Sequence, residues 1–296
     1  MSFSTDVKDE LLAIDDMSDC CIQAQSYGML LFARSFSVSS VSFATENTAT
    51  SERYSQYICD IIGTPPEKSD NDSKMNILSV RTSAERRAVL DYFGHSPKDF
   101  ALRINRANIS GECCFGAFLR GVFLACGSIS SPEKNYHLEF VVPFMKLSGD
   151  LFSFLEEMGL SPKKVIRKGY HVIYFKDSEN IEDLLTAMGA TNSTILLINV
   201  KINKDIRNHI NRRVNFETAN IDRAVKAGMA QAEAIKKIAK QKGLDSLPDN
   251  LRETALVRLE NPEATLSELE ELMEGKVSRS GINHRLNRIM KIAEEL

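Results

Sequence analysis

Two apolar helical segments that carry a glycine at the same place constrain the fold of this chain more than any other feature. Gly28 lies in AQSYGMLLFARSF, and Gly121 lies in AFLRGVFLACGSI, 93 residues further on. Ala117, Gly121 and Ala125 are four residues apart and therefore line one stripe of a helix. A glycine inside a helix costs roughly 1 kcal/mol relative to alanine, so its presence in both segments indicates close packing. We predict that Gly28, Gly121 and Ala125 bring the two helices into contact.

The segments after each of these helices follow matching patterns. After the first come a strand-like stretch at 37–45, a helical one at 51–63, a strand-like one at 74–82 and a helical one at 83–94. After the second come a strand at 136–142, a helix at 145–159, two strands within 163–175 and a helix at 178–189. Both halves are interpreted as αββαββα at a similar offset, which is typical of a tandem duplication. The predicted fold class is α+β.

Length and composition limit the classes of protein that fit. A chain of 296 residues with 43% hydrophobic residues predicts two or three folded domains. It has no run of about 18 apolar residues, and its start, MSFSTDVKDELLAIDD, is acidic where a signal peptide is basic and then apolar. We therefore expect no membrane contact and a cytoplasmic protein. The six cysteines form no Cys-x-x-Cys pair and have no histidine at zinc spacing, so we expect buried reduced thiols and no metal.

Charge divides the chain into two unlike parts. Residues 1–200 hold 19 Lys and Arg against 25 Asp and Glu, whereas residues 201–296 hold 18 against 15. Such an asymmetry indicates an acidic scaffold joined to a basic module.

The C-terminal segment has the pattern of a helix-turn-helix. Thr265 and Glu268 form a capping box at the start of one helix, whose expected apolar stripe is Leu266, Leu269, Leu272 and Met273. That helix ends near Gly275, and either Ser278 or Ser280 caps a second one. The apolar positions of the second helix, Ile282, Leu286, Ile289 and Ile292, recur at helical intervals. Two short capped helices across a tight turn predict an all-α helix-turn-helix domain.

Charge also indicates which of the two helices faces DNA. Residues 260–274 contain six acids and no Lys or Arg, whereas residues 276–292 contain five Lys and Arg and no acid. Because the first turns of a recognition helix enter the major groove deepest, the candidate base readers are Arg279, Ser280, Asn283 and His284. The candidate phosphate contacts are Ser278, Arg285, Asn287, Arg288 and Lys291. A basic helix can also be a merely solvated face.

The segment between the repeats and this module is also predicted to be helical. Ile221, Val225, Met229, Ala232 and Ile235 have helical spacing, and LDSLP interrupts the pattern before the next helix, LRETALVRLENP. The start of the segment is basic, so it either braces DNA from the side or is a solvated hinge.

The segment LRGVFLACG, Leu119 to Gly127, resembles the LAGLIDADG helix of homing endonucleases at Leu119, Gly121, Ala125 and Gly127. The chain from about residue 5 to its end resembles the WhiA family of bacterial regulators, most specifically in 112–140, NRRVNFETANIDRAV and SRSGINHRLNRI. The resemblance implies a LAGLIDADG-like domain whose two glycine helices meet at a pseudo-twofold axis, followed by the helix-turn-helix. It also implies a transcription role linked to sporulation, cell division and chromosome segregation.

The nuclease chemistry of the LAGLIDADG helix is expected to be absent. Each nuclease helix ends in an Asp that holds a divalent metal, but the matching positions here are Ala33 and Cys126. No phosphate loop, dinucleotide fingerprint or Gly-x-Ser-x-Gly occurs. His137 and Glu139 on one strand face are expected to be a solvated pair. We predict no catalytic residue, no metal and no cofactor.

These observations lead to one preferred function and two rivals. We predict a sequence-specific regulator that binds double-stranded DNA in the cytoplasm at the nucleoid, with another transcription regulator or RNA polymerase as a further partner. The expected domains are the two halves at 1–112 and 113–204 and the linker helix with the helix-turn-helix at 205–296. The first rival is an active metal-dependent LAGLIDADG-type endonuclease. The second is a repeat domain that only binds proteins.

Overall fold

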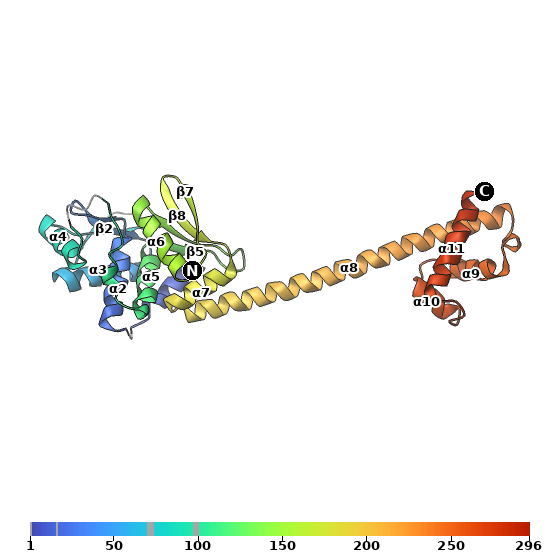
Figure 1. The fold of residues 1–296 in the computed structure, drawn as a ribbon, viewed down its shortest axis with the longest axis horizontal. Coiled ribbons are helices and arrows are strands. Elements are labelled where there is room, and N and C mark those ends of the chain that lie inside the picture. The colour runs from blue at the N-terminus through green and yellow to red at the C-terminus, as the bar shows by residue number, and fades with distance from the viewer. Residues whose placement is uncertain (1, 16, 70–73, 97–100) are drawn as a thin grey trace. The chain divides into compact units, whose positions relative to one another are not determined.

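The computed structural model describes residues 2–15, 17–69, 74–96 and 101–296, which form two compact units. The N-terminal unit covers residues 1–203, and the C-terminal unit covers residues 204–296. The boundary falls inside the long helix α8, Thr191–Gln241. Figure 1 labels the elements of each unit.

The first repeat has the predicted αββαββα order, but the stretches predicted as strands, 37–45 and 74–82, contain only its second and fourth strands, and the first and third lie outside them. Only two residues form the first strand and three form the third, because serine-rich turns and an exposed edge replace regular pairing there. The elements are α2 (Asp19–Leu31), β1 (Ser35–Phe36), β2 (Val41–Thr45), α3 (Thr48–Ile62), β3 (Glu67–Ser69), β4 (Asn76–Ser79) and α4 (Ser83–Tyr92).

The second repeat has the same order. A short 3-10 helix, η1 (Arg106–Asn108), precedes it. Its elements are α5 (Glu112–Cys126), β5 (Gly127–Ile129), β6 (Leu138–Val142), α6 (Met145–Glu157), β7 (Lys163–Arg167), β8 (Tyr170–Phe175) and α7 (Ser178–Met188).

The two sheets have equivalent topology. Their strand orders are β1-β2-β4-β3 and β5-β6-β8-β7, and every pairing is antiparallel. Buried and partly exposed residues alternate along β6, as expected for a sheet with one face on a core. The duplicated α+β fold predicted from the sequence is therefore confirmed.

The two glycine helices form the centre of the N-terminal unit, as predicted. Helices α2 and α5 lie side by side in Figure 1, and their contact is the most extensive between any two described elements. A methyl group on Gly121 would overlap the backbone carbonyl oxygen of Gln25, and one on Gly28 would overlap that of Phe118. Ala125 is partly buried at the edge of the same core. Both repeats contribute to one hydrophobic cluster, so neither half has a core of its own.

Two features of this core were not predicted. Gly116 allows a second close approach, because a methyl group there would overlap the carbonyl oxygen of Ala187 in α7. An additional helix, α1 (Phe3–Leu12), precedes the repeats and buries Val7 and Leu11. The carboxylate of Glu10 on α1 accepts hydrogen bonds from the backbone N–H groups of Asn192 and Ser193, at 2.6 and 3.0 Å, and so caps α8.

The C-terminal unit is all-helical. Its core joins Ile235 and Ile238 of α8 to the helical elements in and after the break predicted at LDSLP, 244–248. These elements are η2 (Leu244–Ser246), α9 (Asp249–Glu260), α10 (Leu266–Leu272) and α11 (Arg279–Glu294). Among the residues that the structure describes, no helix combines the length and apolar character needed to span a bilayer.

Candidate nucleic-acid interface

Helices α10 and α11 are held by the capping groups expected from the sequence. Thr265 Oγ1 accepts from the N–H of Glu268 at 3.3 Å, while the Glu268 carboxylate accepts from the N–H of Thr265 at 2.6 Å. Of the two candidate caps for α11, Ser278 is the one used, since its hydroxyl accepts from the N–H of Gly281. Gly275 has φ +68° in the turn, a conformation that favours glycine. The pair is a helix-turn-helix with defined ends.

One face of α11 is fixed by burial. Ile282, Leu286, Ile289 and Ala293 are all at most 4% exposed and pack in the core of the C-terminal unit. The predicted stripe on α10 is only partly right, because Leu269 and Met273 are buried whereas Leu272 is 52% exposed. Leu272 stands at the last position of a seven-residue helix and lines a surface hollow with Ile221 and Val225 of α8.

The opposite face of α11 carries most of the predicted DNA contacts. Ser280, His284, Asn287 and Lys291 follow one another at intervals of four, three and four, which puts them on one line along the helix. All four side chains are exposed, and His284, Asn287 and Lys291 line a shallow hollow with Arg288. Ser278 is exposed at the start of the helix.

Two predicted base readers lie on a different edge of α11. Arg279 and Asn283 are exposed, but they line a hollow with Thr265 of α10 and Asn220 of α8. The structure therefore divides the predicted base readers into a central line with Ser280 and His284 and an edge with Arg279 and Asn283.

Arg285 differs from the other predicted contacts because it turns toward α9. Its Nη1 donates to the carbonyl oxygen of Asn250 at 3.1 Å and to Thr254 Oγ1 at 3.2 Å. Only 21% of its side chain is exposed, and Glu253 lies 3.8 Å away. This geometry joins α11 to α9 and leaves the guanidinium less available to phosphate than those of Arg279 and Arg288.

Sequence reasoning missed Arg258, which is the largest fully buried side chain of the C-terminal unit at 2% exposure. Its Nη1 donates to the carbonyl oxygens of Asn261, Pro262 and Ala264, at 3.2, 3.5 and 2.6 Å. Burial lowers the pKa of this guanidinium below its ordinary value. The sequence signal was weak, since an arginine near the end of a helix is usually solvated.

The ends of the two glycine helices carry no carboxylate. Ala33 is buried at 2% exposure, and burial raises the pKa of the Cys126 thiol to about 12. Near Cys126, Lys8 Nζ donates to the carbonyl oxygen of Leu124 at 3.3 Å. A buried lysine side chain, whose pKa burial lowers, therefore lies beside the C-terminal end of α5, where the nuclease motif has its acid.

His137 and Glu139 lie less exposed than expected. Their side chains are 20% and 18% exposed, and His137 Nε2 lies 3.0 Å from Glu139 Oε2. Arg167 Nη1 donates to the same carboxylate oxygen at 3.3 Å. The expectation of a solvated pair is only partly right, because both side chains keep some exposure while Arg167 and Tyr174 cover the rest.

The expectation that the cysteines are buried is wrong. Only Cys114 is fully buried, Cys113 is exposed, and the other four are partly buried. The reason is position: Cys20, Cys21, Cys113 and Cys114 lie in the first turns of α2 and α5, at the surface end of the helix pair. All six thiols are free.

Comparison with known proteins decides the family. The model of the WhiA C-terminal HTH domain matches residues 210–293, and that of the WhiA LAGLIDADG-like domain matches residues 115–207. The chain is 38% identical to a probable cell division protein WhiA from Clostridium tetani, over all of this chain and 98% of the relative. It belongs to the WhiA family. A relative of the same name from Ruminiclostridium cellulolyticum is also 38% identical over the same shares of the two chains.

The fold agrees with this assignment. The crystal structure of full-length WhiA from Thermatoga maritima matches with a TM-score of 0.60 at 24% identity, over 100% of this chain and 99% of that one. The predicted resemblance to the WhiA family is confirmed. The LAGLIDADG-like model covers the second repeat and not the first, although both repeats have the same strand order.

Proposed function

We propose that this member of the WhiA family is a sequence-specific DNA-binding transcription regulator whose recognition helix is α11. The observation that carries the proposal is the division of α11 into two faces. Its inner face is fixed by buried apolar residues, and its outer face presents basic, amide and hydroxyl groups with no acid before Glu294. The basic groups of such a helix attract DNA phosphates, no acid there repels them, and the polar groups can pair with base edges.

We assign the contacts according to where each side chain lies. Ser280 and His284 on the central line, with Arg279 and Asn283 on the edge, read bases near the start of the helix. Phosphates are held by Ser278, Asn287, Arg288 and Lys291. Arg285 positions α11 against α9 through its bonds to Asn250 and Thr254.

Single substitutions in α11 test this assignment. Arg279→Ala or Asn283→Ala is expected to weaken binding by about 1 to 3 kcal/mol and to relax base preference, because each removes a contact to a base edge. Lys291→Ala is expected to weaken binding to all sequences alike and to reduce the salt slope by about 1. Fluorescence anisotropy with a footprinted genomic site, its single-base variants and unrelated DNA measures both effects.

The control for these variants is Lys240→Ala, which removes an exposed lysine from the last turn of α8. It is expected to bind like the wild type. Equal losses for Arg279→Ala, Asn283→Ala and Lys291→Ala on every sequence would show that α11 does not face the bases as assigned.

We also propose that the LAGLIDADG-like scaffold does not hydrolyse DNA. Ala33 and Cys126 lack the oxygen ligands that Mg²⁺ requires, and the side chain near Cys126 is Lys8, which also offers no oxygen. We expect supercoiled plasmid to stay intact during incubation with the protein and Mg²⁺, as followed on agarose gels. If the plasmid is nicked, and substitution of a single carboxylate abolishes the nicking, the rival endonuclease function is supported instead.

The biological role that we propose rests on the family. The relatives are named probable cell division proteins, and this supports a link to cell division. We extend this proposal to roles in sporulation and chromosome segregation. We also propose that the protein acts in the cytoplasm at the nucleoid, with RNA polymerase or another regulator as a further partner. For the domains, we propose two repeat halves at 1–112 and 113–204 and a DNA-binding part at 205–296.

A further inference from the structure

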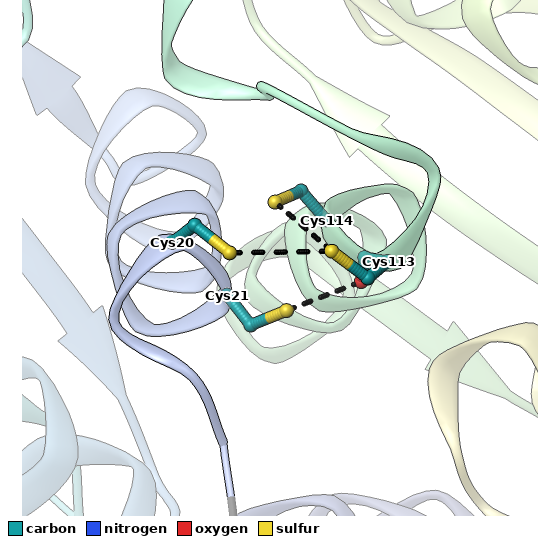
Figure 2. A group of neighbouring side chains, drawn as sticks. All are labelled: Cys20, Cys21, Cys113 and Cys114. Atoms are coloured by element: carbon teal, nitrogen blue, oxygen red, sulfur yellow. Dashed lines mark hydrogen bonds between the residues drawn. The ribbon is translucent and has the colours of Figure 1, made fainter.

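We propose that Cys20, Cys21, Cys113 and Cys114 bind one zinc ion between the two repeats. Their Sγ atoms all lie within 4.8 Å of one another, and Figure 2 shows the four side chains converging from the starts of α2 and α5. Among the described residues, this is the one group of three or more potential ligands close enough to share an ion. It replaces the sequence-based expectation of no metal.

The sulfur positions fit a single tetrahedral ion. With Zn–S bonds of about 2.3 Å, two sulfurs on a tetrahedral zinc lie about 3.8 Å apart. Here Cys113 Sγ lies 3.8 Å from Cys114 Sγ and 4.0 Å from Cys20 Sγ. Four thiolates are the ligands of closed structural zinc sites, whereas Mg²⁺ and Ca²⁺ select oxygen.

The four cysteines follow the duplication. Cys20 and Cys113 are separated by 93 positions, the same offset that relates Gly28 to Gly121. Each pair follows an acidic first residue, Asp19 in α2 and Glu112 in α5. The close approach of the two helices at the glycines therefore also brings the two cysteine pairs together, so that each repeat supplies two ligands.

The surroundings favour thiolate. Both pairs lie in the first turn of a helix, where the free N–H groups stabilise negative charge. Ser18 Oγ lies 3.2 Å from Cys20 Sγ, where its hydroxyl can donate a hydrogen bond to a thiolate.

The proposed site differs from the nuclease metal position. Cys113 and Cys126 lie near opposite ends of α5, about 20 Å apart at 1.5 Å per residue. The zinc would therefore link α2 to α5 far from the ends where the motif acids stand. Its expected role is to hold the two repeats together, as structural zinc ions do in small domains.

Cobalt titration of the full chain tests the proposal. The protein is reduced, stripped of metal with a chelator and titrated anaerobically with Co²⁺, which reports tetrahedral thiolate coordination through its intense visible and near-ultraviolet bands. We expect saturation at one equivalent, displacement of the bands by one equivalent of Zn²⁺, and a higher Tm for the zinc-loaded protein. Cys113→Ser is expected to lose more affinity than the roughly 10- to 100-fold caused by loss of an outer-shell partner.

Cys59→Ser is the matched control, because Cys59 is a partly buried thiol on α3 outside the cluster. It is expected to keep the cobalt spectrum, the stoichiometry and the gain in Tm. Circular dichroism checks that both variants fold, and Cys20→Ser provides a second test from the other helix. The proposal fails if the reduced wild type gives no thiolate-to-cobalt bands, if Cys113→Ser and Cys20→Ser titrate like Cys59→Ser, or if a Cys20–Cys113 disulfide forms and the reduced protein takes up no metal.

Discussion

Gly121→Ala is expected to destabilise the N-terminal unit by about 3 kcal/mol, although alanine is the better helix former. The added methyl group would overlap the carbonyl oxygen of Gln25 and crowd the backbone nitrogen of Met29. Both groups belong to the backbone of α2, so neither can rotate away as a flexible side chain would. Helices α2 and α5 would have to separate, and the core that both repeats share would lose contacts along its centre.

Gly149→Ala is the matched control, because Gly149 lies inside α6 with open space around the position of the added methyl group. This variant is expected to be up to about 1 kcal/mol more stable than the wild type. Urea unfolding followed by tyrosine fluorescence measures both, since all seven tyrosines lie in the N-terminal unit and the chain has no tryptophan. Equal urea midpoints for the two variants would mean that α5 has room for a methyl group at Gly121 and that the helix contact there is not tight.

The repeated fold could be predicted because its signals are local or occur twice. The apolar segments around Gly28 and Gly121 each carry a glycine at the same place, and their similar surroundings indicate duplication. Strands β1, β3 and β5 have only two or three residues, so they offer too few positions for an alternating pattern. These short strands form because each pairs with a longer neighbour, β2, β4 or β6, in the sheet of its repeat.

The cysteine cluster shows what a search for motifs overlooks. Zinc motifs are recognised by ligands close together in the sequence, but here two adjacent pairs are 93 residues apart. They meet only because Gly28 and Gly121 let α2 and α5 touch. The equal offset of the glycines and the cysteines was the available signal.

Charge on the C-terminal helices was predictable as a pattern, but the direction of single arginines was not. Arg279 and Arg288 are exposed as expected, whereas Arg285 bonds to α9 and Arg258 is buried among carbonyl groups. Helical period alone does not separate these cases, because an arginine beside the core can extend to solvent or fold back onto a neighbouring helix. Arg285 bonds to α9 because α9 packs against α11, and Arg258 bonds to the carbonyl groups of the connection that follows α9.

Arg258→Met is expected to destabilise the C-terminal unit by about 3 kcal/mol. The substitution keeps an unbranched side chain in the core but leaves the carbonyl oxygens of Asn261, Pro262 and Ala264 without the donor that they share. These three residues form the connection between α9 and α10, and Gly228 of α8 packs closely on the Pro262 carbonyl. Loosening this connection should therefore also weaken the support of α10 beneath α11, so DNA affinity is expected to fall at temperatures where the wild type still binds.

Arg252→Met on the same helix separates this effect from loss of charge. Arg252 is 40% exposed and pairs with Asp245 and Asp249, which are both more than 90% exposed, so its loss should change stability by about 0.5 kcal/mol or less. Urea unfolding is followed by circular dichroism at 222 nm, which reports both units, and by tyrosine fluorescence, which reports only the N-terminal one. In Arg258→Met the dichroism should fall at lower urea while the fluorescence transition stays in place. Coincident transitions at the wild-type midpoint would show that the guanidinium contributes nothing that methionine packing cannot replace.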